Sequence, residues 1–461
     1  MQKRGCMAWP FEILPFCALL ATLGSVTGCL TGLIPGLHPN TIAILFAGIP
    51  GLTLHFGEIV SLSGYQAEWS GAVVAGAFLV GVLFSHSFVE IIPTAKMGVS
   101  GDDTAVALLP SQRLYAIGRG DLVVDAVSLG GLAAVGIFAF ALFPIRATMG
   151  DPFGLYAHIK PFMAVLLVCI CVIVLNGERT RGRLIRALVL FVLSGLIGLF
   201  VLRFQVPYIV TNSLFGNVYG WGESSFLLPV FSGFFAIPAI MLSEGGKRIE
   251  PTGSGRRERG ENRGPVIRPL VRGLVPSILV GWIPGITNAY ATALSFSIRH
   301  RGPRHMLDSY GYLITYSAVN IGGALNALLA LSTIDRSRNG TLEAIAGFLS
   351  SDSTGWPTLP EPPFCLLVLL LAACIASVIG SAFCIFVGRR LLAGSGRGPG
   401  KRTRYSVILF LLCLVLWSSG PVGYAVLFPC ILLGCWAIVS GSPRIHLMGF
   451  LLLPVIAYFL E

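Results

Sequence analysis

Charged side chains are scarce in this chain, at only 11% of its 461 residues, whereas a soluble protein carries about 25%. The mean hydropathy is correspondingly high, at +0.80, and 54% of the residues are hydrophobic. A soluble globular domain is therefore excluded. The sequence predicts an all-α polytopic protein of the cell (cytoplasmic) membrane, and at roughly 20 residues per crossing its length suits about ten to twelve crossings.

Enzyme signatures are also missing. The chain has no HExxH, GxSxG or GxxxxGK[ST] motif and no clustered metal ligands, so we expect neither catalysis nor a cofactor apart from a coupling ion. One enzymatic alternative stays open, an intramembrane enzyme in which Asp102 and Asp103 hold a metal ion. Adjacent carboxylates point in different directions on most backbones, which argues against a shared metal.

The placement of the cysteines and of the basic residues narrows the class of protein further. The eleven cysteines lie mostly inside apolar runs and form no CxxC pair, so we interpret them as small buried hydrophobic residues. The net charge of +11 comes from basic residues in short loops that lack interleaved aromatic residues, so nucleic acid is not an expected partner. Those loops instead indicate membrane orientation, because cytoplasmic loops are enriched in Lys and Arg.

What the chain does contain is a repeated stretch. GSVTGCLTGLIPGLHPN (residues 24–40) returns in the second half as GLVPSILVGWIPGITN (residues 273–288). When the two Pro-Gly pairs are superposed, small residues coincide at every fourth position: Gly24 with Gly273, Gly28 with Ser277, and Gly32 with Gly281. We interpret this ladder as a helix-packing surface. Two broken apolar helices, one in each half, are typical of the binding site of a transporter built from inverted repeats.

The order of apolar runs predicts two such repeats. Residues 1–243 form the first, with an extra N-terminal helix up to about Thr27, a re-entrant hairpin folded at Pro35-Gly36 and about five further spans. A signal-like start at Lys3 and Arg4 is interpreted as part of a retained first span. Residues 244–269 form a basic linker without apolar periodicity, and residues 270–461 form the second repeat, with its hairpin at Pro284-Gly285. Because five spans separate the hairpins, the repeats should have inverted topology.

This layout places 26 of the 32 Lys and Arg residues on one side of the membrane. The positive-inside rule then assigns the N-terminus, residues 94–120 and the 244–269 linker to the cytoplasm.

The two breaks are the predicted binding site. A broken helix frees N–H groups that suit an anion and carbonyl groups that suit a cation. The expected substrate-binding residues are those at the two breaks: Pro35, Gly36, His38, Asn40 and Thr41 in the first half, and Pro284, Gly285, Thr287 and Asn288 in the second.

Ionisable residues within or beside spans are candidates for coupling or gating. His86 and Glu90 stand at i, i+4 and could share a proton. The loop that follows adds Asp102, Asp103 and Thr104. Other such residues are expected to reach water near span ends: Glu12, Asp125, Arg203 and Asp308.

Two segments carry a family resemblance. GLIPGLHPNTIA (residues 32–43) and SHSFVEIIPTAKMGVSGDDTAVALLPSQRLYAIGRG (residues 85–120) resemble the archaeal branch of the TctA family, the large membrane subunit of tripartite tricarboxylate transporters. The matching features are Pro35-Gly36-Leu37 with Pro39, the second Pro-Gly at residues 284–285, and the loop at residues 102–105. This chain departs from bacterial members in His38 and in the acidic pair of that loop.

The resemblance implies ion-coupled or proton-coupled uptake of an organic anion such as a di- or tricarboxylate, by alternating access. A sodium ion or a proton would be the coupling ion. The implied partners are a solute-binding protein and a small membrane subunit, besides membrane lipids and, as an option, a second copy of the chain in a homodimer. Within the transport class, an alternative is a flippase for a lipid-linked phosphate such as polyprenyl phosphate, since phosphate also suits helix N-termini.

Overall fold

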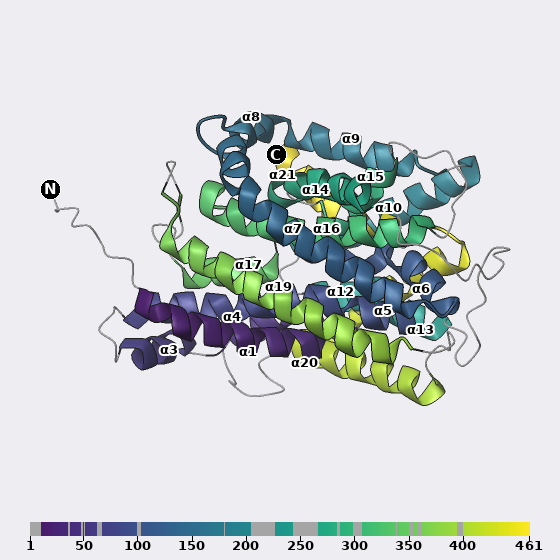
Figure 1. Ribbon diagram of the computed structural model, residues 1–461. Helices are drawn as coiled ribbons and strands as arrows, with labels where there is room; N and C mark the ends of the chain where they lie inside the picture. The colour runs from purple at the N-terminus through teal and green to yellow at the C-terminus, as the bar shows by residue number, and fades with distance from the viewer. Residues whose placement is uncertain are drawn as a thin grey trace.

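The computed structural model describes most of the chain: residues 11–35, 37–47, 49, 51–61, 67–98, 103–178, 180–203, 226–242, 266–283, 286–297, 307–337, 339–349, 355–356, 361–393 and 400–461. Within these ranges every regular element is a helix (Figure 1). Most of the predicted 244–269 linker lies outside the described residues.

The first half runs from the N-terminus to residue 242. Its elements are η1 (Phe11–Ile13), α1 (Leu14–Gly32), α2 (Pro39–Ala47), α3 (Leu52–Ser61), α4 (Ala67–Val89), α5 (Ile91–Met97), η2 (Asp103–Val106), α6 (Leu108–Ala116), α7 (Gly120–Met149), α8 (Leu155–Ile159), η3 (Lys160–Phe162), α9 (Met163–Leu175), α10 (Arg181–Arg203), α12 (Leu227–Phe231), the π-helical turn η4 (Ser232–Ala236) and α13 (Ile237–Leu242).

The second half begins at residue 266. Its elements are α14 (Ile267–Trp282), α15 (Asn288–Ser297), α16 (Leu307–Ile334), α17 (Gly340–Phe348), α19 (Phe364–Leu391), α20 (Lys401–Val439), η5 (Arg444–Met448) and α21 (Gly449–Leu460).

Eight helices in the described part of the chain are long and apolar enough to cross a membrane. The prediction of an all-α polytopic membrane protein is thereby confirmed. One of the eight, α20, is a hairpin rather than one span. The Tyr424 hydroxyl donates to the Leu412 carbonyl oxygen at 2.9 Å, although twelve residues of straight helix extend about 18 Å. The chain reverses at Gly420, which has φ 61°, just before Pro421.

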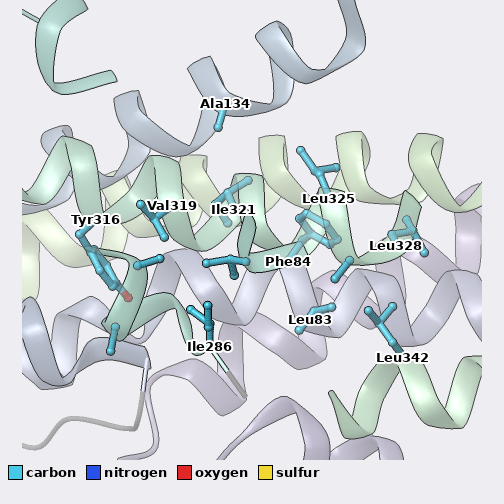
Figure 2. Close-up of a cluster of buried hydrophobic side chains, with 14 of the residues drawn as sticks. Leu83, Phe84, Ala134, Ile286, Tyr316, Val319, Ile321, Leu325, Leu328 and Leu342 are labelled. Atoms are coloured by element: carbon cyan, nitrogen blue, oxygen red, sulfur yellow. The ribbon is translucent and has the colours of Figure 1, made fainter. Parts of the chain in front are cut away.

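Two helices form the centre of the bundle. The most apolar stretch of α4 is 94% buried and that of α16 is 83% buried, against 28–56% for the other candidate spans. Figure 2 shows the apolar contact between them, with Leu83 and Phe84 of α4 below Val319 and Leu325 of α16. Surrounding helices such as α7, α10 and α20 leave many large apolar side chains exposed, as helices facing lipid do.

The directions of the central helices follow from close contacts at glycines. Gly130 of α7 packs against Ile314 and Gly150 lies against Thr333, so α7 and α16 are parallel. The start of α7, at Gly120, meets the end of α19 at Leu392, so α7 and α19 are antiparallel. Gly76 of α4 contacts Leu369 of α19, and Ser85 of α4 contacts Gly380 of α19, so α4 and α19 are parallel. It follows that α4 and α16 run in opposite directions.

The repeated ladder packs in the same way in both halves. α1 lies against α4 through Gly24 on Phe78, Gly28 on Ser85 and Gly32 on Val89. α14 lies against α16 through Gly273 on Thr315, Ser277 on Gly322 and Gly281 on Asn326. The partner residues in the two lists differ by a constant 237 positions. The ladder is therefore a helix-packing surface, and α1 and α14 run in opposite directions because each is parallel to its central helix.

Two details of the predicted layout are wrong. α1 is continuous from Leu14 to Gly32 and carries the ladder, so the first crossing and the first arm of the hairpin are one helix, and no extra helix lies between residue 11 and the first break. The predicted orientation is the second detail. Because α1 is parallel to α4, the start of α1 lies at one end of the bundle, and Met97 with the segment that follows lies at the opposite end (Figure 1). The start of α1 and residues 103–119 therefore cannot both face the cytoplasm. The pattern of charge did not reveal this, because it depended on how many crossings the first 60 residues make.

Candidate functional site

Both predicted breaks are present. In the first half, α1 ends at Gly32 and α2 begins at Pro39, a position where proline is well tolerated because the first helical N–H has no partner within the helix. In the second half, α14 ends at Trp282 and α15 begins at Asn288. We refer to residues 35–41 as the first tip and to residues 283–290 as the second tip. Gly36, Pro284 and Gly285 lie outside the described residues.

Each tip lies beside the middle of a central helix. The Asn288 side chain donates from Nδ2 to Oδ1 of Asn320 at 2.8 Å, and Asn320 is at the midpoint of α16. The His38 ring lies 6.3 Å from the ring of His86, measured between centroids. His86 is only a few residues past the middle of the continuous α4–α5 segment. Both tips thus lie beside the middle of a long apolar helix.

The polar groups of the first tip are engaged by the protein itself. Asn40 Oδ1 accepts hydrogen bonds from both the backbone N–H and the hydroxyl of Thr341, each at 3.0 Å. Thr341 lies in the first turn of α17. The Asn40 N–H in turn donates to Nδ1 of His38 at 3.2 Å, and the Thr41 N–H donates to the His38 carbonyl oxygen at 3.0 Å. Asn40, predicted to bind substrate, joins the first tip to the second half of the chain.

The second tip retains polar atoms that no described residue satisfies. Thr287 is engaged, since its hydroxyl accepts the N–H of Tyr290 at 3.3 Å and caps α15. By contrast, Oδ1 of Asn288, the hydroxyl of Tyr290 and Nε1 of Trp282 are buried and have no hydrogen-bond partner in the part of the chain that the structure describes. A buried polar atom without a partner costs about 1–3 kcal/mol. Three buried polar atoms near this break therefore lack a partner among the described residues.

A series of polar side chains runs from the end of α1, beside the first tip, to the second tip. Thr31 Oγ1 and His86 Nδ1 are 3.1 Å apart, and His86 Nε2 lies 3.9 Å from Glu90 Oε2. Glu90 Oε1 accepts from the Tyr316 hydroxyl at 3.4 Å and from Asn320 Nδ2 at 3.3 Å. Asn320 then contacts Asn288 of the second tip. We refer to Thr31, His86, Glu90, Tyr316, Asn320 and Asn288 as the polar path.

The polar path lies in the most enclosed part of the protein. His86 is 2% exposed, Asn320 4% and Tyr316 0%, and the Glu90 side chain is 14% exposed. Ionisable groups at such positions in membrane proteins are costly and are characteristic of ion or substrate routes. The structure places His86 and Glu90 side by side, and their role in coupling stays a prediction.

Two members of the path, Tyr316 and Asn320, were missed by sequence reasoning. Both stand in the apolar run of α16, four residues apart, and so have the same i, i+4 spacing as His86 and Glu90 in α4. Tyr316 also accepts a hydrogen bond within this group, because Asn320 Nδ2 donates to its hydroxyl oxygen at 3.3 Å. Polar residues at helical spacing inside a central span were the available signal.

The other predicted candidates lie elsewhere or are partly outside the described residues. Thr104 is fully buried in η2, which packs against α15, the helix that follows the second break. Asp102 and the side chain of Asp103 lie outside the described residues, as do the side chains of Arg203 and Asp308. Asp125 pairs with Arg389 at 2.7 Å, near the ends of α7 and α19. Among the described residues, no group of three or more His, Cys, Asp or Glu side chains could hold a metal ion.

Comparison with known proteins identifies the family. The model of the Tripartite tricarboxylate transporter TctA family matches residues 18–449. An uncharacterized protein of Methanocaldococcus jannaschii is 23% identical over 449 residues, which cover 96% of this chain and 99% of that protein. No solved structure matches. The family match spans almost the whole chain, including both tips and both central helices, and on this evidence the protein belongs to the TctA family of tripartite tricarboxylate transporter components.

Proposed function

We propose that this protein is the membrane subunit of a secondary active transporter that carries an organic anion, of the di- or tricarboxylate class, through a site between the two tips. The observation that supports this most directly is the polar path, because it joins the breaks of both halves through the most buried part of the bundle. A merely structural kink would not require a series of hydrogen-bonding side chains between the breaks.

The second tip suits an anion. α15 presents its N-terminal end there, where aligned peptide dipoles favour negative charge. The Tyr290 hydroxyl and the Trp282 indole N–H are donors that are buried without a described partner, and both could be directed to a carboxylate. The first tip adds the N-terminal end of α2 beside His38.

The arrangement of the halves supports a mechanism of alternating access. α1 and α14 have opposite directions and each packs against one central helix through its small residues. Such halves can rock against each other while the site between the tips stays in place. The contact between α4 and α16 is where this movement would occur. By its family, the chain is expected to work with a solute-binding protein and a small membrane subunit, and a homodimer is compatible with this role.

The experiment that tests the proposal is ligand-induced thermal stabilisation of the purified full-length protein. Citrate, succinate, fumarate and polyprenyl phosphate are each added with and without sodium, because a ligand that binds the folded state raises the apparent unfolding temperature. Asn288→Ala should weaken the response to the active carboxylate by about tenfold or more in concentration, as expected for loss of a buried polar contact. Ser377→Ala is the matched control, since Ser377 is buried and its hydroxyl donates within its own helix, to the Ala373 carbonyl oxygen.

Stabilisation by a carboxylate that Asn288→Ala weakens and Ser377→Ala leaves intact would support the proposal. A shift with polyprenyl phosphate alone would overturn it in favour of a lipid-linked substrate. An equal response of both variants and the unaltered protein would mean that the anion binds away from the second tip.

A further inference from the structure

Glu90 occupies a special position because it lies between the tips and also between the halves. It is carried by the first half, at the junction of α4 and α5, whereas both side chains that donate to its Oε1 belong to α16 of the second half. Its separation in sequence from Tyr316 and Asn320 is 226 and 230 residues.

An ionised carboxylate at this place opposes the binding of an anion. Asn288 of the second tip is one side chain away from Glu90, through Asn320. Two negative charges in one enclosed polar region repel each other, and the repulsion is relieved when one of them is protonated. By linkage, a bound anion must then favour the protonated form of Glu90, and a proton on Glu90 must favour the bound anion to the same extent.

Resting on the proposed function, we propose that Glu90 is the binding site of the coupling proton, and that one proton taken up from water accompanies each anion that binds at the second tip. The proton adds to a carboxylate oxygen to give the neutral acid, and no other bond changes. This assigns the coupling ion as a proton rather than sodium.

The same proton alters the contact between the halves. The ionised carboxylate accepts charge-assisted hydrogen bonds from the Tyr316 hydroxyl and the Asn320 amide, and such bonds are about twice as strong as neutral ones. Protonation weakens both at once. The proton thus reduces the cost of separating α4 from α16 at the point where rocking of the halves requires it, which makes movement easier with both ligands bound.

The surroundings of Glu90 contain several other titratable groups. On its own segment these are His86, at 3.9 Å, and Lys96 of α5. The first tip contributes His38, next to His86, and α16 contributes Tyr316. α7 contributes Asp125, which is paired with Arg389 of α19. α1, which packs along α4, has no Asp, Glu, Lys, Arg or His between Leu14 and Gly32.

The test is the pH dependence of anion affinity, measured by calorimetry between pH 5.5 and 8 with fumarate, succinate and citrate. In the unaltered protein the affinity should fall with rising pH, towards tenfold per pH unit once Glu90 is ionised, which is the slope for uptake of about one proton. Glu90→Gln mimics the neutral acid, so its affinity should stay at the low-pH level and lose the pH dependence. Comparing the variant with the unaltered protein for the same anion cancels protons that the anion itself releases.

Glu178→Gln provides a matched control. Glu178 forms the other buried His–Glu pair of the protein's described part, with His446 at 3.0 Å, in the loop between α9 and α10. It lies on no part of the polar path, so this variant should keep the full pH dependence of anion binding.

The outcomes separate the role of Glu90 from the proposed transport function. Anion binding by the unaltered protein together with an unchanged pH slope in Glu90→Gln would overturn the role of Glu90 and leave the proposed function standing. Failure of the unaltered protein to bind any of the three anions would overturn the proposed function itself. If Glu90→Gln does not fold, proton uptake is measured in the unaltered protein by calorimetry in buffers of different ionisation heat. Uptake of no proton there, or a strict need for sodium, would refute the proposal.

Discussion

The two halves of this protein are alike in how their helices pack and different in how their tips use polar atoms. In both, a ladder of small residues brings the first arm of the break against a central helix, with partners spaced identically along α4 and α16. At the first tip, however, Asn40 is bonded to Thr341 of α17. At the second tip, Asn288 Oδ1, Tyr290 and Trp282 retain buried atoms without a described partner.

This difference separates two roles that the sequence motif alone assigned to both tips. The first tip is an anchor, because its amide fastens one half to the other. The second tip is the proposed binding site for the ligand, because three of its buried polar atoms have no partner among the described residues. The polar path connects them, so a ligand at the second tip can act on the contact between α4 and α16. We first predict effects of the packing that the two halves share, and then effects of the different polar contacts at the two tips.

The likeness of the two ladders predicts the largest effects on stability. A methyl group at Gly24 would overlap the Phe78 carbonyl oxygen, and one at Gly273 would lie 2.6 Å from the Thr315 carbonyl oxygen. Backbone atoms cannot move aside cheaply, so Gly24→Ala and Gly273→Ala should each destabilise the fold by about 1–3 kcal/mol or more. Thermal unfolding in detergent measures this. Gly136→Ala in α7 is the control, since a methyl group there meets nothing within 4 Å. Equal stability of all three variants would refute the packing role of the ladders.

The anchoring role of the first tip predicts a loss of stability in Asn40→Ala. The change removes the acceptor of two hydrogen bonds and leaves the Thr341 N–H without its partner, at a cost of about 1–3 kcal/mol. The affinity of the folded protein for its anion should change far less than in Asn288→Ala. A ranking in the other direction, with Asn40→Ala the stronger binding defect and Asn288→Ala the less stable protein, would reverse the two assigned roles.

Contact between the halves predicts a smaller effect for Tyr316→Phe. The substitution keeps the ring among its apolar neighbours (Figure 2) and removes one hydrogen bond to Glu90. The expected loss of stability is about 0.5–1.5 kcal/mol above the pH at which Glu90 ionises, and it should shrink at lower pH as Glu90 takes up its proton. A loss that does not depend on pH would show that the hydroxyl acts independently of Glu90. Tyr458→Phe, at an exposed position near the C-terminus, should leave stability unchanged at every pH.

The His–Glu pair outside the tips predicts the smallest effect. The hydrogen bond from His446 is the main cause that lowers the pKa of Glu178 from its usual value. A carboxyl group whose pKa is lower in the folded state stabilises the protein above its unfolded pKa, and this contribution is lost as pH falls through the folded pKa. Glu178→Gln should therefore reduce stability modestly at neutral pH and flatten the acid side of the unfolding-temperature profile. An acid profile identical to that of the unaltered protein would contradict this assignment.

Much of the candidate site could be predicted because its signals are local. Long apolar runs with little charge specify membrane helices, and Pro-Gly pairs within such runs specify breaks. Small residues at every fourth position specify a helix-packing face, and the contacts at Gly28 and Gly281 confirm it. His86 and Glu90 were found for the same reason, since i, i+4 spacing on one helix brings side chains together whatever surrounds them.

Interactions between distant segments could not be predicted in this way. The direction of α1 depends on which helix its ladder packs against, and a charge count cannot reveal that partner. The use of Asn40 was unforeseen because its partner, Thr341, lies 301 residues away. The sequence by itself determined the membrane class, the two breaks and the ladder, because each is set by hydrophobicity and backbone geometry within a few residues. Only the tertiary structure decided that Asn40 of the first tip bonds Thr341 and that Glu90 meets Tyr316 and Asn320. The contacts of Glu90 arise from the antiparallel packing of the two central helices.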